Sequence, residues 1–175
     1  MPRTPAPKKT RPKVRKKAPV RRTRPKLPRH RQYGIIPIRL GRGDQLEVLL
    51  LTSRGTGRWV IPKGWPMRNR TPAGTARREA YEEAGVKGEL WSRRPVGAYR
   101  YFKDDEKFTG EILVRVFVLT VEEQKKDWPE RGERRTRWFP VRAAATKVAE
   151  PELGKLLRTV PGILIRQKAP VRRKK

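Results

Sequence analysis

Three glutamates in the middle of the chain have the residue type and the spacing that metal chemistry needs. Glu79, Glu82 and Glu83 stand at i, i+3 and i+4, a spacing that places side chains together on one face of a helix. Like charges in such a group repel each other, and their oxygen ligands suit magnesium or manganese. The pattern predicts a divalent metal site, although residues 77–83, which read RREAYEE, also fit a solvated helix surface on which arginines neutralise glutamates.

The helix that must position these glutamates is marked at both of its ends. Thr71 is a favourable N-cap residue, and Pro72 follows it at the first helical position. Gly85 can adopt the left-handed conformation that ends a helix. We therefore predict a helix over residues 72–84.

The segment around this helix resembles the signature of the Nudix hydrolases, G-x5-E-x7-R-E-U-x-E-E-x-G-U, in which U is an aliphatic residue. Residues 64–86 read GWPMRNRTPAGTARREAYEEAGV, and a match over so many fixed positions is specific. Ala80 is a small substitute for the aliphatic residue, and Arg70 stands where the signature has its first glutamate. The positions in register are Gly64, Arg78, Glu79, Glu82, Glu83, Gly85 and Val86.

The resemblance covers approximately residues 33–158. The segments RGTGRWVIPKGW and ERRTRWFPVRAA on either side of the helix resemble the diphosphoinositol polyphosphate and diadenosine polyphosphate hydrolases within the family. The resemblance implies an α/β/α sandwich with a mixed sheet, flanked by disordered basic tails. It also implies a magnesium-dependent hydrolase, with manganese as the alternative ion, that splits a phosphoanhydride bond of a nucleoside or inositol polyphosphate.

The same resemblance implies roles for individual residues. Glu79 and Glu83 become metal ligands, Glu82 is a ligand or its close support, and the backbone carbonyl of Lys63 completes the set. Glu79 ranks first as the base that takes a proton from water, and Arg78 orients the carboxylates. In the family the signature's first glutamate supports the metal site, so arginine at that position changes this support.

Cationic side chains are needed to hold the substrate phosphates. The candidates, any of which could equally be a surface charge, are Arg39, Arg54 and Lys63 at strand ends and Arg68 and Arg70 in the loop before the helix. The sequence does not select a fourth acidic ligand from Asp104, Asp105, Glu106 and Glu111. It does not define a base-stacking pocket either, because scattered aromatic residues are more often part of the core.

The apolar patterns around the motif indicate an α/β fold. Short apolar runs predict strands at residues 33–40, 47–52, 58–61, 112–121 and 138–141, with a hairpin joining the first two. Helical patterns cover residues 72–84 and approximately 141–157. The sheet therefore has helices available to cover it.

The charge is concentrated at the two ends of the chain. Lysine and arginine number 46 against 17 acidic residues, which gives a net charge of +29. Residues 1–32 hold 14 of these cations and residues 166–175 hold six, with no acid in either segment. We expect a disordered, proline-rich arm, a catalytic domain over residues 33–165 and a basic tail, with non-specific nucleic acid as a partner of the arm and tail.

Composition also excludes several classes of function. The chain contains no cysteine and one histidine, which excludes disulfides, thiolate metal sites and cysteine nucleophiles and disfavours histidine-based sites. The N-terminal residues lack the apolar segment of a secretory signal, and their prolines oppose the helix of a transit peptide, so we expect a cytoplasmic protein. Two alternatives to the small-molecule hydrolase stay open: an RNA 5′-pyrophosphohydrolase and a non-catalytic module that binds nucleic acid or polyphosphate.

Overall fold

The computed structural model describes residues 30–106 and 108–168. Within them, one mixed sheet of eight strands is combined with three α-helices and a short 3-10 helix. The strands are β1 (His30–Leu40), β2 (Leu46–Thr52), β3 (Trp59–Val60), β4 (Lys63–Gly64), β5 (Val86–Leu90), β6 (Gly97–Asp105), β7 (Phe108–Gln124) and β8 (Thr136–Pro140). The helices are η1 (Arg42–Asp44), α1 (Pro72–Ala84), α2 (Val141–Lys147) and α3 (Pro151–Lys168).

Strand β1 organises the sheet, whose main path runs β3-β2-β1-β7-β5. It pairs in parallel with β7, where Ile35 lies opposite Phe117, and antiparallel with β2. The two-residue strand β4 also pairs with β1, so that Gly64 lies opposite Tyr33 and Lys63 opposite Gly34. This pairing fixes the Lys63–Gly64 backbone beside the centre of the sheet.

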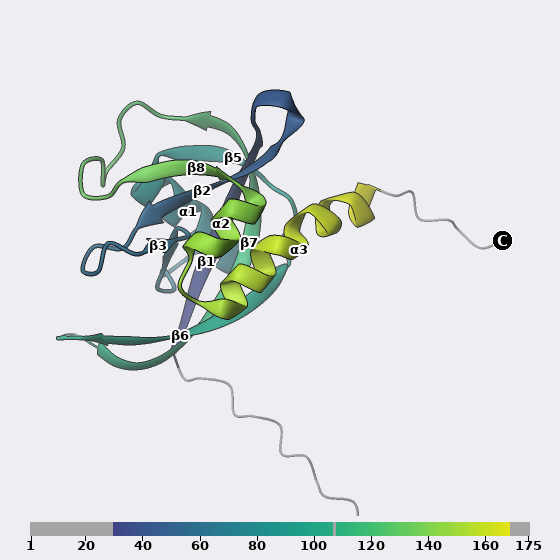
Figure 1. The fold of residues 1–175 in the computed structure, drawn as a ribbon. Helices are drawn as coiled ribbons and strands as arrows, with labels where there is room; N and C mark the ends of the chain where they lie inside the picture. The colour runs from purple at the N-terminus through teal and green to yellow at the C-terminus, as the bar shows by residue number, and fades with distance from the viewer. Residues whose placement is uncertain (1–29, 107, 169–175) are drawn as a thin grey trace, which may run out of the picture.

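Helices cover both faces of the sheet, and Figure 1 shows α2 and α3 on one side with α1 behind it. The alanines Ala76, Ala80 and Ala84 of α1 are completely buried against a core that includes Leu49 and Phe117. Their small side chains allow the helix to lie close to the strands. Leucines of α3 join α2 in the core on the opposite face. The expectation of an α/β/α sandwich with a mixed sheet is confirmed.

Helix α1 has the predicted bounds because its ends are determined locally. The Thr71 hydroxyl accepts a hydrogen bond of 3.0 Å from the Gly74 N–H, which satisfies one of the free donors of the first turn. Gly85 ends the helix with a φ of 69°, a conformation that favours glycine. The Trp128 ring lies over this glycine and leaves no room for a Cβ atom.

The single helix expected over residues 141–157 is wrong, because the structure contains two helices there. The chain is extended at Val148, with φ −78° and ψ 144°, and forms a bridge to Trp59 of β3. Pro151 begins α3 and disfavours a helical conformation in Glu150 before it. The restriction that a proline places on the residue before it thus divides an apparently continuous helical pattern into two helices.

Strands β1, β2 and β7 are longer than predicted, β3 is shorter, and β8 spans 136–140 instead of 138–141. Three strands, β4, β5 and β6, were not predicted, because β4 and β5 are short and β6 alternates polar residues with aromatic ones. β1 begins at His30 and α3 reaches Lys168, so residues 30–32 and 166–168 belong to secondary structure rather than to the arm and the tail. The other residues assigned to the two tails lie outside the described ones. Among the described residues, no helix has the length and apolar character to cross a membrane.

Candidate active site

Helix α1 presents its glutamates toward β4 and toward the segment before β8. Glu83 is buried, with 4% of its surface exposed, while Glu79 and Glu82 are half-buried. The backbone N–H of Glu130 donates to the Glu82 carbonyl at 3.1 Å, which ties the loop before β8 to the end of the helix. The three carboxylates predicted from sequence therefore belong to one region of the molecule.

Glu83 is held by two donors from different parts of the chain. Its Oε2 accepts the Lys63 backbone N–H at 3.0 Å, and its Oε1 accepts Arg134 Nη2 at 2.6 Å. Arg134 also donates to Glu130 at 2.9 Å and to the Thr52 carbonyl at 3.2 Å. Burial raises the pKa of Glu83, while the charges of Lys63 and Arg134 and the backbone hydrogen bond act to lower it. Arg134 was not among the predicted site residues.

Glu79 packs directly against the glycine that begins the signature. A Cβ atom at Gly64 would overlap the Glu79 carboxylate, so the close approach of helix and strand requires glycine there. Burial raises the pKa of Glu79 to about 7, and the charges of Glu83, Glu82 and Glu130 contribute to the rise. Glu79 thus retains a proton in a pH range where an ordinary glutamate is fully ionised.

The Lys63 side chain brings a positive charge to the same region. Its ammonium group lies 5.5 Å from the centre of the Tyr101 ring, close enough for a cation–π contact. Burial lowers the pKa of Lys63, and the charge of Glu83 opposes this effect. Lys63 therefore stands on the carboxylate side of α1, as its predicted role in phosphate binding requires, and the hydrogen bond to Glu83 involves its backbone N–H.

Carboxylate oxygens are suitable ligands for a divalent cation. Glu82 and Glu83 are paired with arginines in this structure, and these ion pairs must rearrange before the glutamates can share a cation. Glu82 is turned toward Arg78, whose Nε donates to it at 2.6 Å. Within the described residues, no three acidic or histidine side chains converge on a common metal position. Burial is the main cause of the raised pKa of Glu79, and repulsion from Glu83 and Glu82 adds to it. A hard cation with oxygen ligands relieves this repulsion. Glu79, Glu82 and Glu83 are the residues that would hold it.

Two buried polar groups that sequence reasoning missed lie near this region. The Tyr99 hydroxyl and Oε2 of Glu150 are both buried and have no hydrogen-bond partner among the described residues. Burial raises the pKa of Tyr99, and the charge of Glu150 is the next cause. Glu150 acts electrostatically on Lys63 as well. The available signal was Pro151, which marks the start of α3 and so places Glu150 immediately before a helix.

The remaining predicted cations are distributed over several places. Arg39 pairs with Glu47 at 2.8 Å and stacks over Trp138, which places it on the β1–β2 hairpin. Arg54 pairs with Glu130 at 2.7 Å and thereby reaches the network around Arg134. The two arginines of the loop before α1, Arg68 and Arg70, are exposed. The structure therefore brings Lys63 to the glutamates directly and Arg54 indirectly, and it does not bring Arg39 to them.

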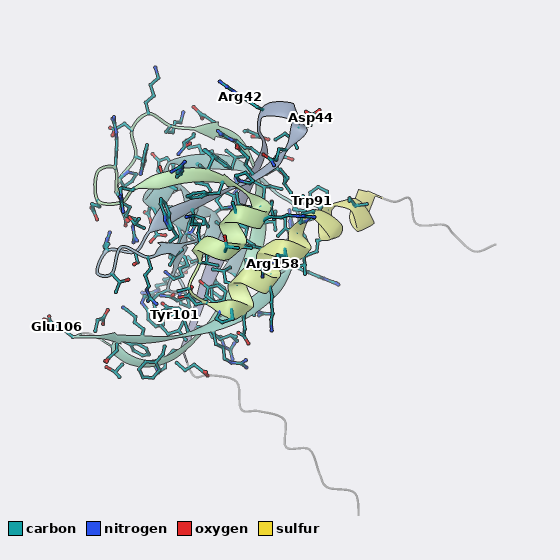
Figure 2. All side chains as sticks on the ribbon, in the orientation of Figure 1. Arg42, Asp44, Trp91, Tyr101, Glu106 and Arg158 are labelled. Carbon is teal, nitrogen blue, oxygen red and sulfur yellow. The ribbon has the colours of Figure 1, made fainter. Side chains whose placement is uncertain are left out.

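The four acidic candidates for a further metal ligand belong to the β6–β7 hairpin. Asp104 accepts from Thr109, Asp105 accepts from the Phe108 N–H, and Glu111 lies 3.7 Å from Arg100. Figure 2 shows Glu106 at the far end of the hairpin, whereas Tyr101 lies where the hairpin meets the body of the molecule. Local partners thus occupy Asp104, Asp105 and Glu111. Glu130 and Glu150 are the further acids whose charges act on the site.

The chain has a mixed sheet between two helical layers, and a carboxylate-bearing helix lies beside a lysine-glycine strand. These features define an α/β/α protein whose candidate site combines carboxylates with cations. A model of the NUDIX domain matches residues 28–160, and the chain therefore belongs to the Nudix family. The resemblance found in the signature is confirmed.

Individual relatives extend the comparison. Nudix hydrolase 12, mitochondrial, of Arabidopsis thaliana is 36% identical over 127 residues, which are 63% of this chain and 62% of the relative. Diphosphoinositol polyphosphate phosphohydrolase 3-alpha of Homo sapiens is 41% identical over 101 residues, which are 56% of this chain and 57% of the relative. The chain thus covers less than two thirds of the length of either protein.

Solved structures support the same fold. The C. elegans Ap4A hydrolase in a binary complex superimposes with a TM-score of 0.59 at 20% identity, over 78% of this chain and 98% of the other. The NUDIX domain of Shewanella oneidensis NrtR, solved with ADP ribose, gives a TM-score of 0.55 at 15% identity. At these identities the likeness concerns the fold alone.

Proposed function

We propose that the chain is a metal-dependent hydrolase of phosphoanhydride bonds in a nucleoside or inositol polyphosphate. The observation that carries the proposal is the arrangement of Glu79 and Glu83 beside the Lys63–Gly64 strand, with Lys63 and Arg134 adjacent. Carboxylates supply a cation site, and the nearby cations supply contacts for phosphate oxygens. A bound magnesium ion would neutralise charge on the bridging phosphates.

Each side chain has a defined part in the proposed reaction. A water oxygen attacks one phosphorus atom, the bond from that phosphorus to the bridging oxygen breaks, and the water proton passes to a carboxylate. Glu79 is the proposed acceptor, because a pKa of about 7 suits a base that works near neutral pH. Lys63 neutralises a phosphate oxygen, and Arg78 orients Glu82.

Similar proteins support the proposed substrate class. They include a diphosphoinositol polyphosphate phosphohydrolase and, by fold, an Ap4A hydrolase. We propose that this chain acts on a compound of one of these two types. Both carry several phosphates, and the positive charge of Lys63 beside the carboxylates favours such a ligand. Arg134 holds the carboxylates in place through its bonds to Glu83 and Glu130.

A panel of substrates with magnesium tests the proposal. Diadenosine polyphosphates, inositol pyrophosphates and nucleoside triphosphates are compared by kcat/KM, for the wild type and for Glu79→Gln and Glu83→Gln. The matched control is Glu122→Gln, which removes an exposed carboxylate on β7. We expect a loss of about 100-fold or more in the two site variants and no loss in the control. Wild-type turnover in both site variants would contradict the assignment.

The large positive charge favours a second candidate, removal of pyrophosphate from RNA 5′ ends. A net charge of +29 attracts polyanions at long range, and the basic ends would hold the body of the RNA. A 5′-triphosphorylated RNA in the same panel distinguishes it, since a preference for this substrate over the small compounds would select it. Arg70, which departs from the signature, favours the non-catalytic alternative, and no turnover on any substrate would select that one.

We propose a cytoplasmic location, which microscopy of the tagged full chain tests.

A further inference from the structure

The face of α1 that turns away from its buried glutamate borders a cleft rich in cations. This cavity of about 670 Å³ lies between α1 and the edge of the sheet at β5. Its charged and aromatic lining consists of Arg70, Arg77, Arg78, Tyr81 and Lys87, which we call the basic cleft. The volume lies within the range of ligand sites in proteins.

The positions on α1 separate this cleft from the candidate active site. Residues 74, 77, 78 and 81 follow one another at intervals of three, one and three, so they share one side of the helix. Ala76 and Ala80 face the sheet, and Glu79 and Glu83 face β4. The helix thus carries a buried face, an acidic face and a basic face, and Arg78 connects the last two through its bond to Glu82.

The cations of the basic cleft are mostly uncompensated. Within residues 30–106 and 108–168, no carboxylate forms an ion pair with Arg70, Arg77 or Lys87. The part of the chain that the structure describes contributes no acidic residue to the lining of the cleft. Cations elsewhere in the described residues have partners, such as Arg54 with Glu130. Like charges that converge without partners repel each other, and an anion in the cleft removes this repulsion.

The Tyr81 ring contacts two of the cations that line the cleft. The Arg78 guanidinium lies 5.6 Å and the Lys87 ammonium 5.0 Å from the centre of its ring. Both distances allow a cation–π contact, which holds the two charges on one aromatic side chain. Arginine guanidinium groups match phosphate oxygens with two parallel hydrogen bonds, and lysine acts as a point charge beside them. The lining therefore suits phosphate better than a carboxylate of single charge.

We propose that the basic cleft binds a chain of linked phosphate groups at a site separate from the Glu79–Glu83 face. Several unpaired cations in one cavity require a ligand with several negative charges close together, and an oligophosphate provides them. The ligand is either a free oligophosphate or the phosphate chain of a nucleotide or of an RNA 5′ end. The binding needs no metal and no hydrolysis, so it stands independently of the proposed catalytic activity.

Calorimetric titration of the full chain with sodium tripolyphosphate, in the presence of EDTA, tests the site. The variant Arg77→Gln/Lys87→Gln removes two exposed charges from the cleft. The matched control, Arg142→Gln/Lys155→Gln, removes two exposed charges from α2 and α3 across the sheet. Both variants lower the net charge equally, so the non-specific attraction of the basic ends changes equally in each. Unfolding midpoints measured alongside verify that both variants fold.

We expect the dissociation constant for tripolyphosphate to rise about tenfold or more in the cleft variant relative to the control variant. Equal dissociation constants for the two variants would overturn the proposal. Titrations with ATP, with 5′-triphosphorylated RNA and with the same RNA bearing a 5′-hydroxyl identify the source of the phosphate chain. If the cleft variant loses affinity for both RNAs equally and keeps its affinity for tripolyphosphate, the cleft contacts the nucleic acid backbone and the proposal is refuted.

Discussion

The buried pair between Arg134 and Glu83 makes a strong prediction about stability. The two side chains are 9% and 6% exposed and meet at 2.6 Å, and Arg134 also bonds Glu130 and the Thr52 carbonyl. Removal of one partner from a buried pair leaves a charge without compensation, which typically costs about 3–5 kcal/mol. We therefore expect Arg134→Met to lower the free energy of unfolding by this amount at pH 8.

The pH dependence of this loss identifies its cause. Burial raises the folded-state pKa of Glu83, so its ionisation costs stability above the unfolded-state pKa and costs nothing below it. Loss of Arg134, whose charge lowers the pKa of Glu83, raises it further. The difference in stability between Arg134→Met and the wild type must therefore grow as the pH rises from 5 to 8.

Urea unfolding followed by tryptophan fluorescence measures the effect, since the chain has five tryptophans. The control Arg131→Met removes an exposed arginine that pairs with the exposed Asp127 at 3.8 Å, and about 0.5 kcal/mol or less is expected. The double variant Arg134→Met/Glu83→Gln removes the uncompensated charge and should recover roughly half of the loss. A loss below about 1 kcal/mol for Arg134→Met, or one independent of pH, would refute the reasoning.

Four further predictions concern α1, the residues that contact it, and the ends of the chain. In EDTA, Glu79→Gln should raise the unfolding midpoint at pH 8 more than at pH 5, because the raised pKa of Glu79 makes its ionisation costly at high pH. Gly64→Ala should cost about 1–3 kcal/mol in urea unfolding and most of the turnover, because the new methyl group displaces the Glu79 carboxylate. Arg70→Glu should tighten magnesium binding and weaken tripolyphosphate binding, both measured by calorimetry. Deletion of residues 1–29 and 169–175 should keep turnover of a small substrate and flatten the salt dependence of duplex DNA binding, for which each phosphate contact contributes about −0.9 to the log–log slope.

Local signals explain what the sequence could predict. Helix α1 was predicted with its observed bounds because Thr71 and Gly85 act on the backbone of their own neighbourhood. The strands β1, β2 and β7 were recognised because buried runs of branched residues are continuous there. The glutamates follow from the helix, since a fixed periodicity places them on one side.

Contacts between distant segments explain what the sequence could not predict. Arg134 and Glu83 are separated by 51 positions. The pairing of β8 with β2 and the backbone bond from Glu130 to Glu82 bring the arginine to the helix. Arg134 stands among neighbouring arginines in ERRTR, and no local pattern distinguishes the one that is buried. Arg39 lies away from the glutamates for a related reason, because the β1–β2 hairpin supplies Glu47 as its partner. The sequence predicts that Arg39 stands at the end of a strand, but it does not predict whether that end of the strand lies near the glutamates.

The arginine at position 70 is the departure from the signature that we expect to affect two faces of α1. The signature has a glutamate there, which in the family supports the metal site and its arginine partner. In the structure Arg78 pairs with Glu82 at 2.6 Å, and Arg70 lines the basic cleft. We expect a glutamate at position 70 to compete with Glu82 for Arg78 and to neutralise part of the cleft. Arg70→Glu would then release a candidate metal ligand and weaken oligophosphate binding together, whereas a change in only one of the two properties would contradict this link.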